Sequence, residues 1–136
     1  MEALGAQALP VRVDVRDADQ VEAMSAQALE RFGRIDLLVN NAGICVPGLL
    51  HEVSAAALQR EIATNLVGPA LLARRTIASL RARGAGGDLV FISSENVSVP
   101  RPFQPGYTAS KWGLEGLART LRLELDGTGI RSTIVR

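Results

Sequence analysis

Several features are scarce in this sequence of 136 residues, and each scarcity excludes a class of protein. A single cysteine, Cys45, excludes an internal disulfide and fits a reducing, cytoplasmic setting. The formal net charge is +1, so no excess of one sign points to nucleic acid or to an anionic membrane surface. No apolar run approaches the ~18 residues that a membrane span needs. We therefore expect a cytoplasmic protein that binds neither nucleic acid nor membrane.

Other single residues add little chemistry of their own. The only histidine, His51, has just the adjacent Glu52 as a possible fellow ligand, so we expect no metal site. The opening MEALGAQALPVRVDV lacks the basic and apolar regions of a secretory signal peptide. We expect Cys45 to be a small buried residue rather than a nucleophile. Trp112 should pack at a helix contact or beside the substrate.

Apolar runs of strand length alternate with helix-length segments along the chain, and 47% of its residues are apolar. Strands are expected at 8–15, 35–40, 88–93 and 130–135. Helices are expected from Asp17 to Gly33, from Ser54 to about Arg83 and from about Tyr107 to Leu125. This alternation predicts parallel strands joined by right-handed crossovers. We expect one domain over residues 1–136, an α/β fold with a doubly wound parallel sheet in three layers.

Local signals support the expected helices. Asp17, with Gln20 three residues later, has the pattern of a capping box, and Ser54 can cap the second helix. In the third helix, Leu114 and Leu121 fall on one apolar stripe. The caps and the stripe therefore agree on where helices begin and which face is buried.

Ligands of a doubly wound sheet bind beyond the carboxyl ends of its strands. Asp14 and Val15 end the first expected strand, residues 40–43 follow the second, and Ser93 and Ser94 end the third. The last long helix starts after that third strand, so its first turns should lie beside the same rim. The sequence thus selects a small set of candidate site residues before any family is considered.

The only tyrosine of the chain lies four residues before a lysine, in YTASK (107–111). At this spacing on a helix, Tyr107 and Lys111 share a face and can touch. An ammonium beside a phenol favours its ionised form, and such a phenol can exchange a proton with an alcohol or a ketone near neutral pH. Ser94 is the candidate for holding the substrate oxygen. The alternative is a surface tyrosine and a solvated lysine, which the preceding pair of serines disfavours.

A bend is expected inside the second long helix. Pro69 has no N–H to bond the carbonyl of Asn65, and Gly68 should ease the bend. A carbonyl left free near the rim could hold a water that passes protons from Lys111 to solvent. The alternative is that Asn65 and Gly68 only shape the helix.

Taken together and in this order, these motifs resemble the short-chain dehydrogenase/reductase family. The resemblance rests on DV (14–15), NNAG (40–43), the asparagine of TNLVG (Asn65), ISS (92–94) and YTASK (107–111). The runs FGRIDLLVNNAGI and GLARTLRLELDGTGIR are also similar to that family, so the resemblance covers nearly the whole chain. Ser94 lies 13 residues before Tyr107, an interval that suits the family and selects Ser94 over Ser93.

The resemblance implies a Rossmann-like fold and a role for each site residue. Tyr107 would be the catalytic acid/base, Ser94 would orient the substrate oxygen and Asn65 would hold a relay water. Lys111 would favour the tyrosinate and hold the nicotinamide ribose. The implied cofactor-binding residues are Asp14, Val15, Asn41, Ala42, Gly43, Tyr107 and Lys111. Apart from the resemblance, Asp14 could be only a turn residue and Gly43 could serve only a tight turn.

The sequence departs from the family pattern in three places. The family's first strand and glycine-rich TGxxxGIG turn are not found, and GAGGDL (84–89) reads as a loop. Arg136 is the last residue where the family continues to a Pro-Gly turn, and Val97 replaces a frequent glycine. We expect a domain truncated at both ends, with marginal stability and weak cofactor binding. Without the family's strands 1 and 2, the segment 8–15 should dangle, pair with its distant neighbour or borrow another chain.

Two hypotheses on function follow from these observations. The first is an NAD(P)-dependent oxidoreductase that interconverts a secondary alcohol and a ketone, a homo-dimer or homo-tetramer in its full-length form. The second is a truncated, inactive chain that keeps only the association surfaces of the family. A dehydratase or epimerase that uses the same Tyr–Lys pair is a weaker third possibility. The cofactor is expected to be NAD or NADP. The sequence does not distinguish the two, because the residues that select between them would lie around the family's second strand.

Overall fold

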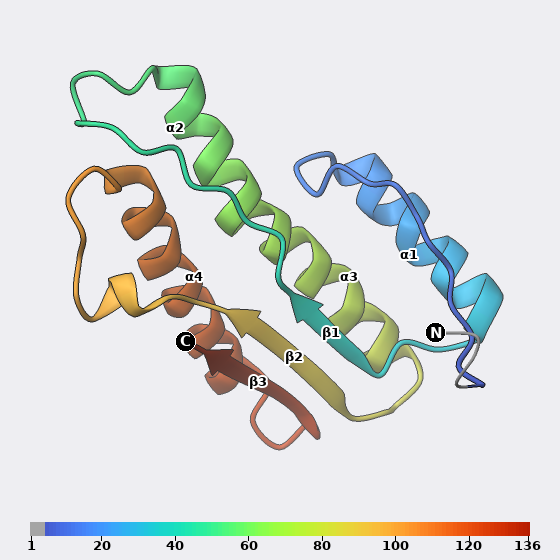
Figure 1. Cartoon of the computed structure of the whole chain (residues 1–136). Coiled ribbons are helices and arrows are strands. Elements are labelled where there is room, and N and C mark those ends of the chain that lie inside the picture. The colour runs from blue at the N-terminus through green and yellow to red at the C-terminus, as the bar shows by residue number, and fades with distance from the viewer. Residues whose placement is uncertain (1–4) are drawn as a thin grey trace.

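The computed structural model describes residues 5–136, so the first four residues of the expected domain lie outside it. Three parallel strands form one sheet in the order β1 (Leu37–Asn40), β2 (Gly87–Ile92) and β3 (Ile130–Val135) (Figure 1). The register places Leu38 opposite Leu89. These three strands confirm three of the four expected from the sequence.

Helices precede the first strand and connect the successive strands. They are α1 (Ala18–Phe32), α2 (Ala55–Ile62), the π-helical turn η2 (Ala63–Val67), α3 (Gly68–Ala82), the 3₁₀ turn η3 (Glu95–Val97) and α4 (Pro105–Glu124). All three expected helices are confirmed. The second is divided by η2, and the third begins two residues earlier than expected.

The expected caps form, with one change at α1. The Asp17 carboxylate accepts from the backbone N–H groups of Asp19 and Gln20, and Ser54 accepts from the N–H of Ala57. The Gln20 amide does not reach back to the Asp17 backbone as a capping box would. It donates to the Asp17 carboxylate at 2.8 Å and accepts from the N–H of Asp14 at 2.9 Å. This helix start is therefore tied to the segment that precedes it.

The expected strand at 8–15 is wrong, because residues 6–14 form an extended segment without strand pairing. A strand needs a hydrogen-bonded neighbour, and the sheet places only β2 and β3 beside β1. An apolar hollow lies between Leu9 and Val11 of this segment and Leu38 of β1. The segment thus remains separate from the sheet instead of pairing directly with β1.

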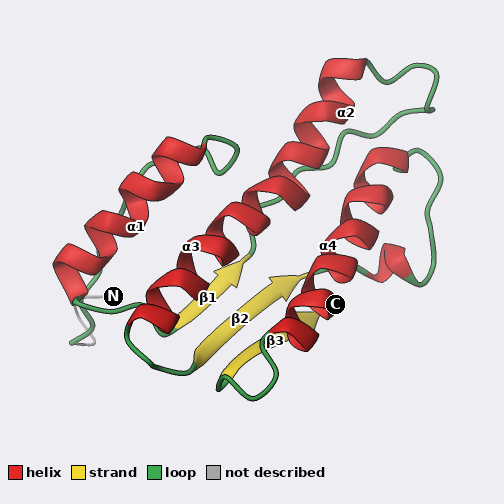
Figure 2. Cartoon of the chain, turned by 180° about the vertical axis from the view of Figure 1, so that it is seen from behind, coloured by secondary structure: helices red, strands yellow, loops and turns green. Residues whose placement is uncertain are grey.

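The described helices cover one face of the sheet. Figures 1 and 2 show α3 and α4 side by side on that face, with α1 beyond α3. Leu89 and Phe91 of β2 point into this layer and are fully buried with Leu80, Leu114 and Ala118 of the helices. Residues 5–136 thus supply the sheet and one of the two expected helical layers.

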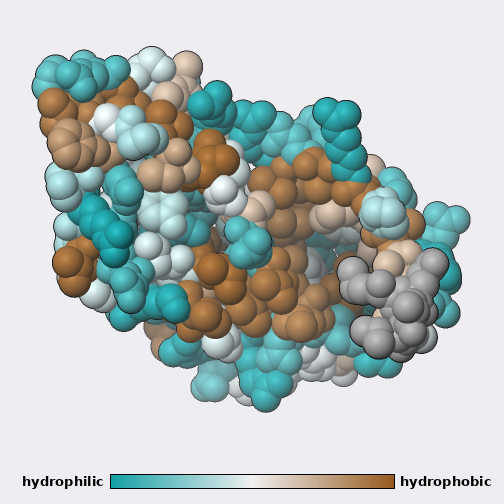
Figure 3. Space-filling model, in the orientation of Figure 1, coloured by the Kyte–Doolittle hydropathy of each residue, from teal (hydrophilic) through white to brown (hydrophobic). Residues whose placement is uncertain are grey.

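The opposite face of the sheet remains open. Leu37 and Val39 of β1 are 56% and 50% exposed, and Val135 of β3 is 45% exposed. Figure 3, drawn in the orientation of Figure 1, shows apolar side chains gathered over the face that the sheet presents.

None of the helices within residues 5–136 combines the length and apolar character of a membrane span.

A π-helical turn, η2, lies at the place of the expected helix bend. The N–H of Gly68 reaches back to the carbonyl of Ala63, five residues earlier, and Pro69 offers no N–H for Asn65. Gly68 has ordinary right-handed helical backbone angles. Its missing side chain matters because a Cβ would come within 2.8 Å of the Val15 side chain. Glycine therefore lets α3 begin against residues 14–15.

Candidate active site

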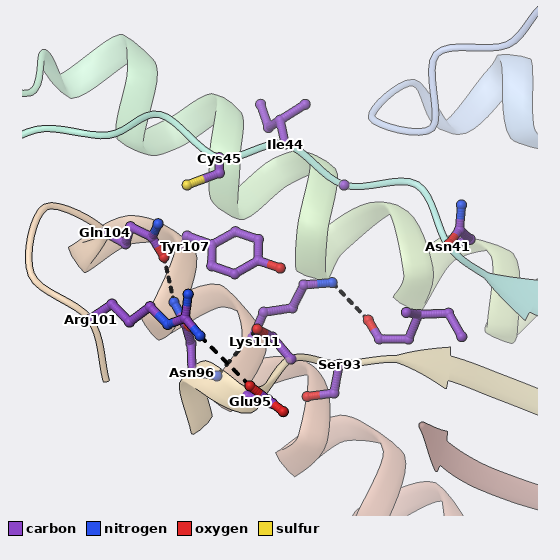
Figure 4. Close-up of a pocket in the computed structure, with 13 residues that line it drawn as sticks. Asn41, Ile44, Cys45, Ser93, Glu95, Asn96, Arg101, Gln104, Tyr107 and Lys111 are labelled. Atoms are coloured by element: carbon purple, nitrogen blue, oxygen red, sulfur yellow. Dashed lines mark hydrogen bonds and ion pairs between the residues drawn. The ribbon is translucent and has the colours of Figure 1, made fainter. Parts of the chain in front are cut away.

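A cavity of about 580 Å³ opens beyond the carboxyl end of β2, against the first turns of α4 (Figure 4). Its lining includes Ser94 after β2, Tyr107 and Lys111 from α4, and Asn41, Gly43 and Ile44 after β1. Parallel strands end at one rim, so segments far apart in the sequence meet there. The expected convergence of the rim residues on one site is observed for all of these.

Tyr107 and Lys111 are neighbours in the first turns of α4. The Lys111 Nζ lies 5.6 Å from the centroid of the Tyr107 ring. Figure 4 shows the phenol hydroxyl directed toward the lysine side chain. The one-turn spacing therefore brings ring and amine together inside the cavity, as the pattern predicts.

Lys111 is buried although it carries an ionisable amine. The residue is 4% exposed, and its Nζ donates to the carbonyl of Ile92 at 2.7 Å. Burial penalises the charged form and lowers the pKa of Lys111 below its usual value. An ammonium has three donors, so two remain after the bond to Ile92 for groups that enter the cavity.

The two serines after β2 have different surroundings. Ser93 is buried, and its hydroxyl donates to a carboxylate oxygen of Glu115 at 2.8 Å. Both serines line the cavity, but the Ser94 hydroxyl is not engaged with Glu115, and its oxygen accepts from the N–H of Asn96 at 3.2 Å. Because the Ser94 oxygen accepts that bond, its hydrogen can be directed at a substrate oxygen. The geometry therefore favours Ser94 over Ser93, the same choice that the interval to Tyr107 favours.

Asn65 holds the wall of the cavity with its side chain. It is fully buried, accepts from the N–H of Ile44 at 2.8 Å and donates to the carbonyl of Ile44 at 2.8 Å. Its amide also donates to the Ser110 hydroxyl at 3.0 Å. A Cβ on Gly43 would lie 3.4 Å from the Asn65 Oδ1 and 3.7 Å from the Lys111 Nζ. Gly43 thus lies next to both Asn65 and Lys111, so a side chain added there would contact both of them.

A second hollow continues the first toward the amino end of α1. It is lined by Asp14, Val15, Ala42 and Gly43, and Gly43 belongs to both cavities. The Asp14 carboxylate is already occupied, because the Arg16 Nε donates to it at 2.8 Å. This hydrogen bond is the main cause that lowers the pKa of Asp14 to about 2. All the expected cofactor residues therefore lie along one connected surface, with Asp14 paired to a cation.

Some cavity residues were not foreseen from the sequence. Cys45 is exposed and lines the cavity opposite Tyr107, so the expectation that it is buried is wrong. Arg101 lies at the opening, 3.7 Å from a carboxylate oxygen of Glu95. Cys45 and Arg101 come from irregular loops, where neither spacing nor period indicates which side chains turn inward. Asn96 of η3 was foreseen with Glu95 as a possible substrate contact, because both follow Ser94 on the rim; it is buried, and its amide donates to the side chain of Gln104.

Trp112 and the possible metal ligands lie apart from this chemistry. Trp112 is 53% exposed and does not line the cavity. His51 is exposed, with its Nε2 3.9 Å from a Glu52 oxygen. Within residues 5–136, no group of three or more histidine, cysteine or acidic side chains could hold a metal ion. The candidate site therefore consists of the phenol, the amine, the hydroxyl and their supports.

The fold and the site define a class: a Rossmann-like α/β domain with a Tyr–Lys pair at the carboxyl rim of its parallel sheet. The family described as short chain dehydrogenase matches residues 1–136. The chain belongs to the short-chain dehydrogenase family.

Curated relatives and solved structures agree with this assignment. The chain is 38% identical over 132 residues to cis-4-hydroxycyclohexanecarboxylate dehydrogenase of Sinomonas cyclohexanicum, covering 96% of this chain and 53% of that protein. It is 32% identical over 135 residues to L-rhamnose 1-dehydrogenase (NAD(P)(+)) of Sphingomonas sp. (strain SKA58), covering 99% and 53%. A metagenomic short-chain oxidoreductase in complex with NADP superimposes with a TM-score of 0.91 at 35% identity, covering 98% and 60%.

The chain spans about half the length of the curated relatives that it matches. The named cofactors of two similar proteins, NAD(P)⁺ and NADP, agree with the expectation of NAD or NADP. The aligned half contains every motif that carried the resemblance in the sequence, from DV to YTASK.

Proposed function

We propose that this chain carries the catalytic part of an NAD(P)-dependent oxidoreductase that interconverts a secondary alcohol and a ketone. The observation that supports this most directly is the meeting of three groups at one cavity. They are the Tyr107 phenol, the Lys111 amine and the Ser94 hydroxyl. A proton acceptor, a cation that favours its ionised form and an orienting hydroxyl are what the oxidation of an alcohol requires.

In the direction of oxidation, the Tyr107 phenolate takes the proton of the substrate hydroxyl. Lys111 stabilises that phenolate across the short gap between ring and amine. Ser94 donates its hydrogen to the substrate oxygen and holds it near the phenol. The nicotinamide, when bound, supplies the acceptor for the hydride that leaves the substrate carbon. Reduction of the ketone uses the same groups in reverse.

The proton that Tyr107 receives must reach solvent. Lys111 has two donors left after its bond to Ile92, and Asn65 lies beside it beneath Gly43. Because Pro69 cannot donate to the Asn65 carbonyl, a water held by that carbonyl would connect Lys111 to the outside. We therefore keep Asn65 as the relay residue, while its side chain fixes Ile44.

The residues present fit a nicotinamide dinucleotide at two of its parts. Gly43 leaves open the space above Lys111 where a nicotinamide ribose would be held. Asn41 and Ala42 continue the surface toward Asp14 and Val15, which would meet the adenine. Asp14 must share its carboxylate with Arg16 or release it in order to accept from the adenine amino group. We therefore expect weak binding of the nucleotide to these residues alone.

Two of the named relatives indicate which substrates to try first. One is named for L-rhamnose and another for a hydroxycyclohexanecarboxylate, which are both small hydroxylated rings. The test incubates the purified chain with NAD⁺ or NADP⁺ and a panel of such alcohols, and follows formation of the reduced nicotinamide. Tyr107→Phe, which removes only the hydroxyl, should lower turnover by about 100-fold or more.

Binding is measured separately, through the fluorescence of NADH or NADPH on addition of the chain. Enhanced fluorescence with both wild type and Tyr107→Phe, and turnover with wild type alone, is the expected result. No fluorescence change at millimolar nucleotide would favour the second hypothesis, an inactive chain that keeps association surfaces. The exposed Trp112 of α4 would lie on such a surface, in keeping with the homo-dimer or homo-tetramer expected for a full-length form.

A further inference from the structure

A buried carboxylate lies beneath the candidate site and has no part in the proposed chemistry. Glu115 of α4 is 2% exposed. Its Oε1 accepts from the Ser93 hydroxyl at 2.8 Å and from the Arg136 Nε at 2.7 Å. Its Oε2 accepts from Arg136 at 2.7 Å and from Arg119 at 3.2 Å. Both oxygens are therefore saturated by donors from three different segments.

The position of Glu115 on α4 connects it to the catalytic pair. Tyr107, Lys111 and Glu115 follow one another at intervals of four residues and share one face of the helix. Lys111 donates to the carbonyl of Ile92, and Glu115 accepts from the side chain of the next residue, Ser93. Two successive residues of the β2 end are thus held by one face of α4, immediately before Ser94.

This arrangement constrains where Ser94 can point. The backbone N–H of Ser93 also donates to the carbonyl of Val135 at 2.7 Å, so Ser93 is fixed from both sides. Fixing Ser93 fixes where the chain enters Ser94, and the Ser94 oxygen is itself held by the N–H of Asn96 at 3.2 Å. Arg136 faces Glu115 with two donors, a geometry that holds a carboxylate in one orientation.

We propose that Glu115 is a positioning residue, which holds the Ser94 hydroxyl toward the cavity by way of Ser93, with Arg136 as its counter-ion. This inference rests on the proposed function, because Ser94 has to orient a substrate oxygen for its direction to matter. Glu115 does not line the cavity, and its hydrogen bond to a cavity residue is the one to Ser93. We therefore expect its effect on the reaction to pass through Ser93.

Ser93→Ala separates positioning from stability, because it removes the bond to Glu115 and keeps the Glu115–Arg136 pair. A matched control exists in β3: Ser132 is 5% exposed, and its hydroxyl donates to the carbonyl of Ala118 in α4 at 2.8 Å. Ser132→Ala therefore removes another buried strand-to-helix bond, at a distance from the site. Both variants should lower the urea midpoint, and Ser93→Ala should lower it more because its lost bond is to a carboxylate; turnover is therefore compared where both variants are fully folded.

The experiment measures kcat, the KM for nucleotide and amide hydrogen exchange at residues 93–97. We expect Ser93→Ala to lower kcat by about 10-fold to 100-fold with an unchanged nucleotide KM, and Ser132→Ala to leave kcat within twofold. Exchange at 93–97 should be faster in Ser93→Ala only. Glu115→Gln added to Ser93→Ala should cause little further loss of kcat, because residues that act as a unit are non-additive.

The outcomes separate the two proposals. If the wild type turns over and Ser93→Ala keeps its kcat, the positioning role is overturned and the proposed function stands. If the wild type shows no turnover with any alcohol of the panel, the proposed function fails, and amide hydrogen exchange then tests the positioning role by itself. Faster exchange at 93–97 in Ser93→Ala only would support the proposal that Glu115 fixes this loop. Unchanged exchange would overturn that proposal.

Discussion

Two opposing effects act on the charge of the buried Lys111 amine. The proposed function needs a cation beside the Tyr107 ring, yet burial disfavours the charge of Lys111 and lowers its pKa. The bond to the Ile92 carbonyl offsets part of the cost of burial. Function and stability should therefore respond differently when the amine is removed.

Lys111→Met tests this opposition. We expect turnover to fall by about 100-fold or more, because the phenol loses its cation. The Lys111 pKa is lowered below 10.5 in the folded chain, so between that lowered value and 10.5 the unfolded chain binds more protons. The stability of the wild type relative to Lys111→Met should then rise as pH rises through this window. Urea unfolding of both proteins at pH 7 and pH 10 measures the change, and a difference that falls with pH would contradict it.

The surroundings of Glu115 favour its charged form, whereas burial disfavours the charge of Lys111. Its hydrogen bonds to Arg136 are the largest cause that lowers its pKa from 4.5 to about 2. The folded chain therefore keeps this carboxylate ionised at pH values where the unfolded chain takes up a proton. The stabilisation is fully present above pH 4.5 and is lost as pH falls toward 2.

Glu115→Gln should make this loss visible. At pH 7 the variant should be less stable by about 1–3 kcal/mol, because an amide N–H₂ would face the Arg136 donors. The difference from wild type should shrink steadily below pH 4.5. Denaturant unfolding at several pH values measures it, with the exposed Glu124→Gln on the same helix as the control. A gap of constant size between pH 7 and pH 3 would show that the carboxylate has no such role.

At the scale of elements, the turn from η2 into α3 contacts two segments of the rim, Ile44 after β1 and Val15 before α1. The Asn65 side chain holds Ile44, and three residues later Gly68 packs against Val15. A Cβ at Gly68 would meet the carbonyl oxygen of Val15 at 3.0 Å as well as its side chain. The close approach, rather than the bend itself, therefore requires glycine here.

Gly68→Ala is predicted to destabilise the chain by about 1–3 kcal/mol, since overpacking outweighs the better helix propensity of alanine. Gly116→Ala in α4 is the matched control, because a Cβ there meets nothing within 4 Å. That variant should be more stable by about 0.5–1 kcal/mol. Thermal or urea unfolding compares the two. If both substitutions stabilise, the contact with Val15 does not constrain the helix.

These elements also show what the sequence could predict. Capping residues and period-3.6 stripes are local, so the helices from Asp17 and Ser54 were located correctly. A strand also depends on partners, and segment 8–15 has strand composition but no neighbour to pair with. The Tyr–Lys pair was predictable because both residues lie on one helix. Glu115 also lies on that helix at the next interval of four, but its partner Arg136 comes from another segment.

At the scale of the whole molecule, one helical layer covers a sheet that has two faces. Val39 pairs with Val90 across the open face, next to the exposed Leu37. At the end of β1, Asn40 is 4% exposed, and neither polar atom of its side chain has a partner within residues 5–136. Buried amides without partners are rare and costly, and apolar sheet faces are normally covered. The exposed apolar side chains mark the open face, whereas Asn40 shares the register of Leu38 and Phe91 on the helix-covered face and adds an unpartnered amide at the β1 edge.

The purified chain should therefore bind a dye that fluoresces on apolar surfaces and should self-associate as its concentration rises. Val39→Lys should lower both signals, because a charge on the open face opposes stacking of two sheets and discourages pairing at the β1 edge. Leu123→Lys is the control: Leu123 is 80% exposed on α4, away from the sheet, and its replacement should leave dye binding nearly unchanged. Dye fluorescence with sedimentation velocity measures both effects. Equal responses to the two lysines would mean that the open face is no more adhesive than the rest of the surface, and a monomeric wild type without dye binding would mean that the sheet face is covered in solution.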